Sequence, residues 1–206
     1  MPSEKKNSFP TDIHRSFVSS FYGNLLTSYF GIGVILITVL VIYVKTGQAF
    51  FLAMAAAFSV VSAYRMIWFS RFRATTADHE LNEHEIALFE RHYLIGSSAV
   101  ALILGLVTCY ALGVSGDVFA ELASVNLTLA CMVSVVGRNY GSGRAVLLLT
   151  ILACGPMGIG FLMEGGPYMA FMGGLLLPFA LTILSMAKGV REFLFRTCWP
   201  VATSPS

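Results

Sequence analysis

Six long apolar stretches constrain the fold of this 206-residue chain more than any other feature. An α-helix needs about 20 apolar residues to span the hydrocarbon core of a bilayer, and each stretch is long enough. Backbone groups in lipid must be hydrogen-bonded within the segment, and the stretches do not alternate as barrel strands do. The sequence therefore predicts an all-α integral membrane bundle of six transmembrane helices, at approximately Leu25–Val44, Gln48–Phe69, Tyr93–Leu112, Val118–Val136, Ala145–Met163 and Tyr168–Ala187.

The composition agrees with a membrane protein and argues against two other classes. Only 12% of the residues are charged, whereas soluble domains carry about 25%. The basic residues form no patch, so we expect no nucleic-acid partner. The four cysteines show no Cys-x-x-Cys pair, which favours neither a disulfide framework nor a metal site.

The basic residues lie in alternate gaps between the apolar stretches. The other gaps hold only Lys45, which is the pattern of the positive-inside rule. This predicts that both termini are cytoplasmic, with residues 1–24 as an N-terminal segment, 25–190 as the membrane domain and 191–206 as a short tail. The residues that carry the pattern are Lys5, Lys6, Arg15, Arg71, Arg73, Arg91, Arg138, Arg144, Lys188, Arg191 and Arg196.

The connections between the stretches differ greatly in length. The outer ones, Lys45–Gly47, Gly113–Asp117 and Glu164–Pro167, are short turns, which excludes an outer ligand domain. A ligand must then enter through the bilayer or between helices. The connection 70–92 is predicted to be a long acidic cytoplasmic loop containing a short amphipathic helix that runs into the third transmembrane helix.

Four polar residues within the apolar stretches are candidate site residues: Arg65, Glu121, Asn126 and Thr128. A charge at membrane depth is costly and often functional. Arg65 has a simpler interpretation, in which its long side chain reaches the interface. Glu121 and Thr128 share one helical face, and we favour a purely structural role for them, hydrogen bonding between helices, over lining an interior cavity.

A glycine-rich segment between the fourth and fifth stretches is the sharpest local feature. Glycines, two arginines and a following helix N-terminus predict an anion-binding or switch site. The alternative is a tight cytoplasmic turn. The candidate residues are Gly137, Arg138, Asn139, Gly141, Ser142 and Arg144. No catalytic triad, carboxylate pair or cofactor fingerprint is present in the sequence, so we expect no enzyme, no cofactor and no metal.

Two motifs carry a resemblance to a known family. Glu90-Arg91-His92-Tyr93-Leu94-Ile95-Gly96 precedes the third helix, and Val136-Gly137-Arg138-Asn139-Tyr140-Gly141-Ser142 follows the fourth. Gly165-Gly166-Pro167-Tyr168 and Val190-Arg191-Glu192 are a weaker third match. Together they resemble the N-terminal membrane (MASE-like) domain of bacterial diguanylate cyclases and cyclase/phosphodiesterase fusions.

The resemblance implies a sensory input module in the bacterial inner membrane. In that family a cytoplasmic GGDEF domain, often followed by an EAL domain, makes or degrades cyclic diguanylate. This chain ends at Ser206 without such a domain, so we expect either an input module that works with a separate output domain or signalling partner, or a truncated cyclase. Glu90, Arg91, Tyr93 and Gly96 join the candidate switch residues on this ground, and a homodimer is left open.

Two other functions are consistent with the residues. A small membrane transporter or channel would place Glu121, Asn126 and Thr128 along its path, with the Gly- and Pro-interrupted fifth and sixth helices. A structural membrane subunit would need none of these residues for binding.

Overall fold

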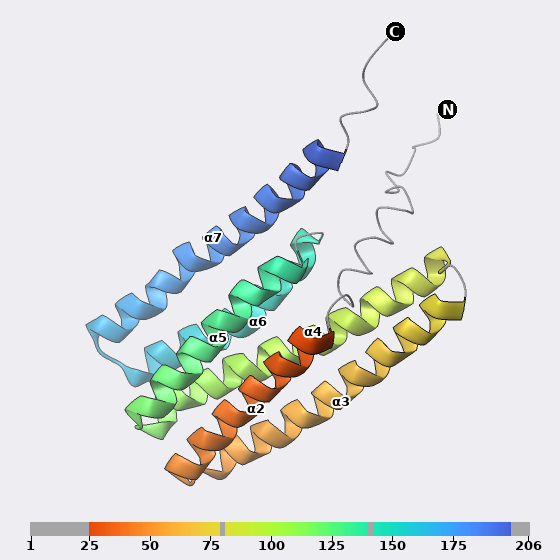
Figure 1. The fold of residues 1–206 in the computed structure, drawn as a ribbon. Helices are drawn as coiled ribbons and strands as arrows, with labels where there is room; N and C mark the ends of the chain where they lie inside the picture. The colour runs from red at the N-terminus through yellow and green to blue at the C-terminus, as the bar shows by residue number, and fades with distance from the viewer. Residues whose placement is uncertain (1–24, 79–80, 140–141, 199–206) are drawn as a thin grey trace, which may run out of the picture.

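The structure, a computed structural model, is all-helical over the residues it describes, 25–78, 81–139 and 142–198. Side chains are described for 28–77, 81–134, 139 and 142–190. The predicted all-α class is confirmed, and the helices run side by side as a bundle (Figure 1). Their bounds are α2 Leu25–Thr46, α3 Ala49–Asp78, α4 Glu83–Tyr110, α5 Val118–Asn139, α6 Gly143–Glu164 and α7 Pro167–Cys198.

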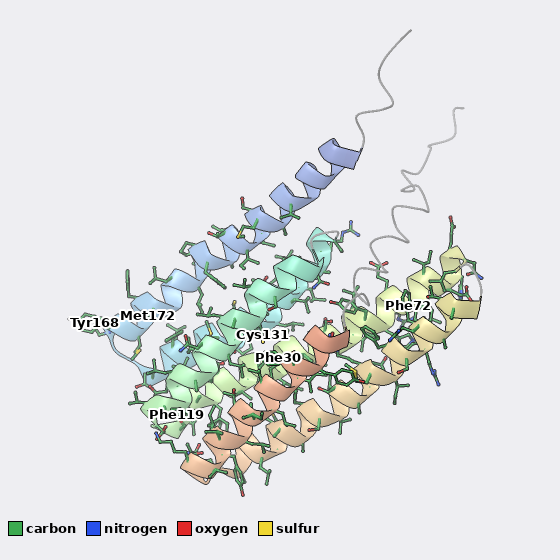
Figure 2. All side chains as sticks on the ribbon, viewed as in Figure 1. Phe30, Phe72, Phe119, Cys131, Tyr168 and Met172 are labelled. Carbon is green, nitrogen blue, oxygen red and sulfur yellow. The ribbon has the colours of Figure 1, made fainter. Side chains whose placement is uncertain are left out.

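Five of these helices are long and apolar enough to cross a membrane, and α5 contains a shorter apolar segment, Val118–Ser134. The predicted count of six is thus approximately met. Large apolar side chains such as Phe30, Tyr168 and Met172 are exposed on the outside of the bundle (Figure 2). So much exposed apolar surface is stable only against lipid. The chain is a multi-pass membrane protein.

One end of the bundle, here called the short-loop end, consists of three tight connections. Helix α4 continues through a π-helical turn, Ala111–Ser115, so the predicted connection Gly113–Asp117 shortens to two residues. Gly47, Gly116 and Gly165 have positive φ angles of 67°, 62° and 84°. Glycine adopts this region without a steric penalty, which is why the chain turns there.

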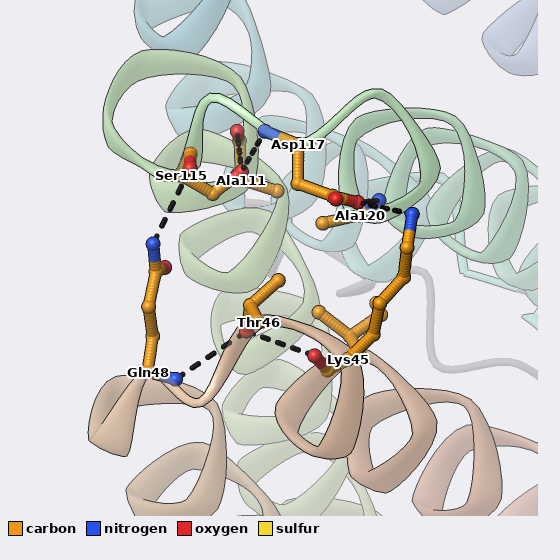
Figure 3. A network of polar contacts seen from close by, with 8 residues as sticks. Lys45, Thr46, Gln48, Ala111, Ser115, Asp117 and Ala120 are labelled. Atoms are coloured by element: carbon orange, nitrogen blue, oxygen red, sulfur yellow. Dashed lines mark hydrogen bonds and ion pairs between the residues drawn. The ribbon is translucent and has the colours of Figure 1, made fainter.

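Polar contacts join two hairpins at the short-loop end (Figure 3). Lys45 Nζ lies 3.0 Å from Asp117 Oδ1, and Gln48 Nε2 donates to the Ser115 carbonyl at 3.3 Å. Asp117 also caps α5, since its Oδ1 accepts from the Ala120 amide at 2.9 Å. The Ala120 amide and then Lys45 lower the pKa of Asp117 below its usual range. These contacts tie the α2–α3 hairpin to the α4–α5 hairpin.

The predicted connection 70–92 is helical over most of its described length. Helix α3 continues to Asp78 and α4 begins at Glu83. The apolar residues of this region pack between the two helices, where Phe69, Phe72, Leu81, Ile86, Phe89 and Tyr93 form a buried cluster. The expected amphipathic helix is therefore the first part of α4.

Helix α4 starts at a capping box outside the predicted membrane span. Asn82 Oδ1 accepts from the Glu85 amide at 2.9 Å, and Glu85 Oε2 accepts from the Asn82 amide at 3.0 Å. The 30 residues of α3 give a helix of about 45 Å, longer than the ~30 Å hydrocarbon core. Figure 1 shows α3, α4 and α7 extending beyond the others at this end, here called the arginine end (Arg71, Arg73, Arg91, Arg144).

Helices α4 and α6 are in close contact at two glycines, Gly105 and Gly160. A Cβ at Gly105 would lie 2.7 Å from the Leu152 carbonyl oxygen, and one at Gly160 would lie 2.8 Å from Cys109 Cα. Such distances are closer than real Cβ atoms allow. The two glycines therefore let the backbones touch, which is how small residues hold membrane helices together.

Candidate functional site

A cavity of about 130 Å³ lies between α2, α3, α4 and α5, toward the arginine end. Its wall combines apolar and polar side chains. Ile35, Phe58 and Leu104 are buried apolar members. The polar members come from all four helices and are Ser28, Arg65, Tyr93, Ser97, Ser134 and Asn139. Three of the residues predicted from separate parts of the sequence, Arg65, Tyr93 and Asn139, thus border one space.

Arg65 is turned toward α4. A Cβ at Gly96 would lie 2.6 Å from Arg65 Cγ and 3.1 Å from Cδ, so the stem of the arginine occupies the space that a larger residue would fill. The Arg65 guanidinium carbon lies 6.0 Å from the centroid of the Tyr93 ring. Gly96 and Tyr93 therefore fix the position of the charge at the cavity wall.

The glycine-rich segment divides into parts with different surroundings. Asn139 is the last residue of α5, is only 1% exposed and borders the cavity. Ser142 caps α6 by accepting from the Ala145 amide at 3.3 Å, and Arg144 is exposed. Gly141 and the side chain of Arg138 lie outside the described residues, and Gly137 lies in α5. Only Asn139 of this predicted group faces the cavity in the part described.

Ser97 was not predicted from the sequence. Its Oγ is buried and makes no hydrogen bond within the described part of the chain. In contrast, Ser59 and Ser134 donate to the carbonyl oxygen four residues earlier in their helices. A serine in an apolar helix usually donates its hydroxyl hydrogen bond to such a carbonyl. The buried Ser97 hydroxyl does not, and this marks Ser97 as a candidate binding residue.

The entry motif of α4 divides by helical periodicity. Tyr93 and Gly96 are one turn apart and face α3. Glu90 and Arg91 line a separate surface groove, which also includes Leu148 of α6. The motif thus contributes two residues to the neighbourhood of the cavity and two to another face.

An aromatic cluster lies beside the cavity. Tyr64 Oη is 2.6 Å from His92 Nδ1, and the Trp68 ring stacks on His92 with centroids 3.5 Å apart. Arg71 lies 5.2 Å from the Trp68 centroid. A narrow space of about 20 Å³ is lined by both Arg65 and His92. The spacing of Tyr64 and Trp68, four residues on one helix, is the only sequence signal for this cluster.

The remaining membrane candidates lie elsewhere. Thr128 Oγ1 is 2.8 Å from Thr108 Oγ1, so the predicted interhelical hydrogen bond is present. Glu121 is half-buried in the first turn of α5, near the short-loop end, and Asn126 is exposed. None of the three borders the cavity.

The cavity wall can bind a small molecule through both charge and apolar contact. A guanidinium and hydroxyl groups stand on one part of the wall, and buried aliphatic and aromatic side chains on another. This combination of apolar lining with few polar groups is typical of ligand sites. In comparisons with known proteins, no family model, no curated protein and no solved structure matches the chain.

Proposed function

We propose that this chain is an integral-membrane sensory input module, similar to those that regulate cyclic diguanylate signalling. It lies in the bacterial inner membrane with the arginine end in the cytoplasm. The observation that supports the proposal is the shared cavity. Tyr93 of one resemblance motif and Asn139 of the other border it together with Arg65.

The arrangement of the helices suggests how binding is transmitted. A ligand in the cavity touches α3, α4 and α5 at once. Helices α3 and α4 continue past the cavity to the arginine end, where their apolar cluster holds them together. A ligand that contacts one arrangement of these helices better than another shifts the population toward it. A separate cytoplasmic output domain or signalling partner then reads the shift.

A chimera tests this function directly. A GGDEF catalytic domain is joined after Cys198, and cyclic diguanylate is measured in living bacteria. We expect Arg65→Gln and Asn139→Leu to change the product level by about fivefold or more, which is the lower range of coupling between sites. Thr182→Val, on the exposed face of α7, is the matched control and should leave the level unchanged.

Equal output from all chimeras, at equal membrane abundance, contradicts the sensory proposal. The transporter or channel alternative then gains weight, and it predicts solute flux into proteoliposomes that Glu121→Gln abolishes. Absence of both output change and flux leaves the structural subunit. The chimera variants and the flux assay with Glu121→Gln together separate the three functions.

A further inference from the structure

We infer that the cavity binds a small carboxylate or similar anion with a short apolar body, held by Arg65 and Ser97. This inference deepens the proposed function, and it rests on the cavity being the signal site. The two resemblance motifs do not indicate which ligand the cavity binds. It follows instead from the charge, the hydrogen-bond donors and the size of the space.

The charge at the wall comes from Arg65. A guanidinium presents a planar fork of N–H donors that matches a carboxylate, and such pairs are stronger than neutral hydrogen bonds. The contacts with Gly96 and Tyr93 hold the side chain in place before a ligand arrives. Little side-chain freedom is therefore lost on binding.

Ser97 supplies the second donor. Its buried Oγ has no hydrogen-bond partner in the described residues and lies on a residue that lines the cavity. A buried hydroxyl without a partner is unfavourable, and an anionic oxygen would satisfy it. Ser134 also lines the cavity, but its hydroxyl already donates to the Ala130 carbonyl at 3.2 Å. The two serines therefore differ in what they offer to an anion.

The size and the apolar wall limit the ligand. Ile35, Phe58 and Leu104 bury their side chains around the same space. A cavity of 150 Å³ in another protein holds benzene, so about 130 Å³ admits about six non-hydrogen atoms. Butyrate has this size and combines a carboxylate with an apolar chain. Nucleotides and sugar phosphates are too large.

Thermal unfolding of the purified full chain in an uncharged detergent tests the inference. Sodium butyrate is the probe, and butyramide is its uncharged counterpart of nearly the same shape. Because a ligand of the folded state raises stability with concentration, butyrate should raise the unfolding midpoint in a saturable manner. Butyramide should give a much smaller rise at equal concentration.

Three variants locate the binding site. Arg65→Gln should abolish the butyrate response. Ser97→Ala should weaken apparent affinity about tenfold, as expected for loss of one hydrogen bond to a charged group. Ser59→Ala is the matched control, because Ser59 lies outside the cavity wall and donates to the Ala55 carbonyl, and it should bind as the parent does. If Arg65→Gln does not fold, Ser97→Ala and the comparison with butyramide still decide the question.

The same assay separates a small free carboxylate from an anionic lipid. Micelles containing phosphatidylglycerol present a larger anionic group from the bilayer, and phosphatidylcholine micelles are the control. Phosphatidylglycerol should give no Arg65-dependent rise, and a rise that competes with butyrate would overturn the limit to a small ligand. Equal responses to butyrate and butyramide, or a full butyrate response in Arg65→Gln, overturn the inference.

The outcome is distinguishable from that of the proposed function. Binding in detergent requires no output domain, so butyrate can bind even if the chimeras show no change. That result keeps the anion site and rejects the sensory proposal. Conversely, altered chimera output without anion binding keeps the sensory proposal and rejects the ligand class.

Discussion

At the scale of single residues, the polar side chains inside the bundle have two different fates. Thr108 and Thr128 satisfy each other between α4 and α5, with oxygens 2.8 Å apart. Ser97 and Ser62 keep buried hydroxyls without partners in the described residues. The hydrogen-bonded threonines hold two helices together. The unpartnered serine hydroxyls lower the stability of the folded state unless a ligand accepts their hydrogen bonds.

Replacing Thr108 tests the structural kind. Thr108→Val keeps the shape and removes the hydrogen bonds to Thr128 and to the Ser124 carbonyl. We expect the free energy of unfolding in detergent to fall by about 1 kcal/mol, as for other hydrogen bonds between membrane helices. Thr182→Val is the control, because Thr182 bonds only to its own helix at an exposed position. Equal stability of the two variants would show that the Thr108 contact contributes nothing.

At the scale of elements, the contact between α4 and α6 depends on space rather than on polar groups. Gly105 and Gly160 each lie against the backbone of the facing helix. Val107, Leu149 and Met157 are buried on the same helices. Backbones this close gain many dispersion contacts, which are the main attraction between apolar helices in lipid.

Two alanine substitutions on α6 test this contact. Gly160→Ala places a Cβ 2.8 Å from Cys109 Cα, so it should lower the free energy of unfolding by about 1–3 kcal/mol through overpacking. Gly155→Ala meets open space and should be neutral or slightly stabilising, because alanine favours helix. The measurement is chemical unfolding of both variants in detergent. A loss of stability in Gly155→Ala as large as in Gly160→Ala would reject close packing as the cause.

At the scale of the whole molecule, charge sets the orientation and the helix lengths set the shape. The short-loop end carries Lys45 alone among the basic residues of its connections, whereas the arginine end carries most of the others described. The longest helices, α3, α4 and α7, extend toward the arginine end (Figure 1). The helical surface that extends past the rest of the bundle therefore lies at this end.

Reporter fusions test this orientation. Green fluorescent protein joined after Cys198 should fluoresce, and alkaline phosphatase at the same place should be inactive. After Gly116 the two results should be reversed. The physical reason is that basic segments resist translocation across the inner membrane. Active phosphatase after Cys198 would contradict the proposed topology.

Much of the architecture was determined by the sequence alone. Apolar runs of membrane length can satisfy their backbones in lipid only as helices, and glycines in the short gaps permit tight turns. The helix class, the approximate count and the short connections followed from this. The length of α3 and α4 did not follow, because charged residues at 70–92 suggested a solvated loop. The side chains of Phe72, Ile86 and Phe89 instead pack together in one buried cluster between α3 and α4.

The cavity was decided only by the tertiary structure. Arg65 on α3, Tyr93 and Ser97 on α4, and Asn139 on α5 come from three separate parts of the sequence. Their meeting depends on how these helices are rotated and displaced against one another. Apolar patterning specifies such rotations poorly in a membrane, where lipid and protein interior are equally apolar. The close contact at Gly96 instead fixes α4 against α3, and those at Gly105 and Gly160 fix α4 against α6. The sequence thus determined which segments are helices, and packing at small residues decided which side chains share a site.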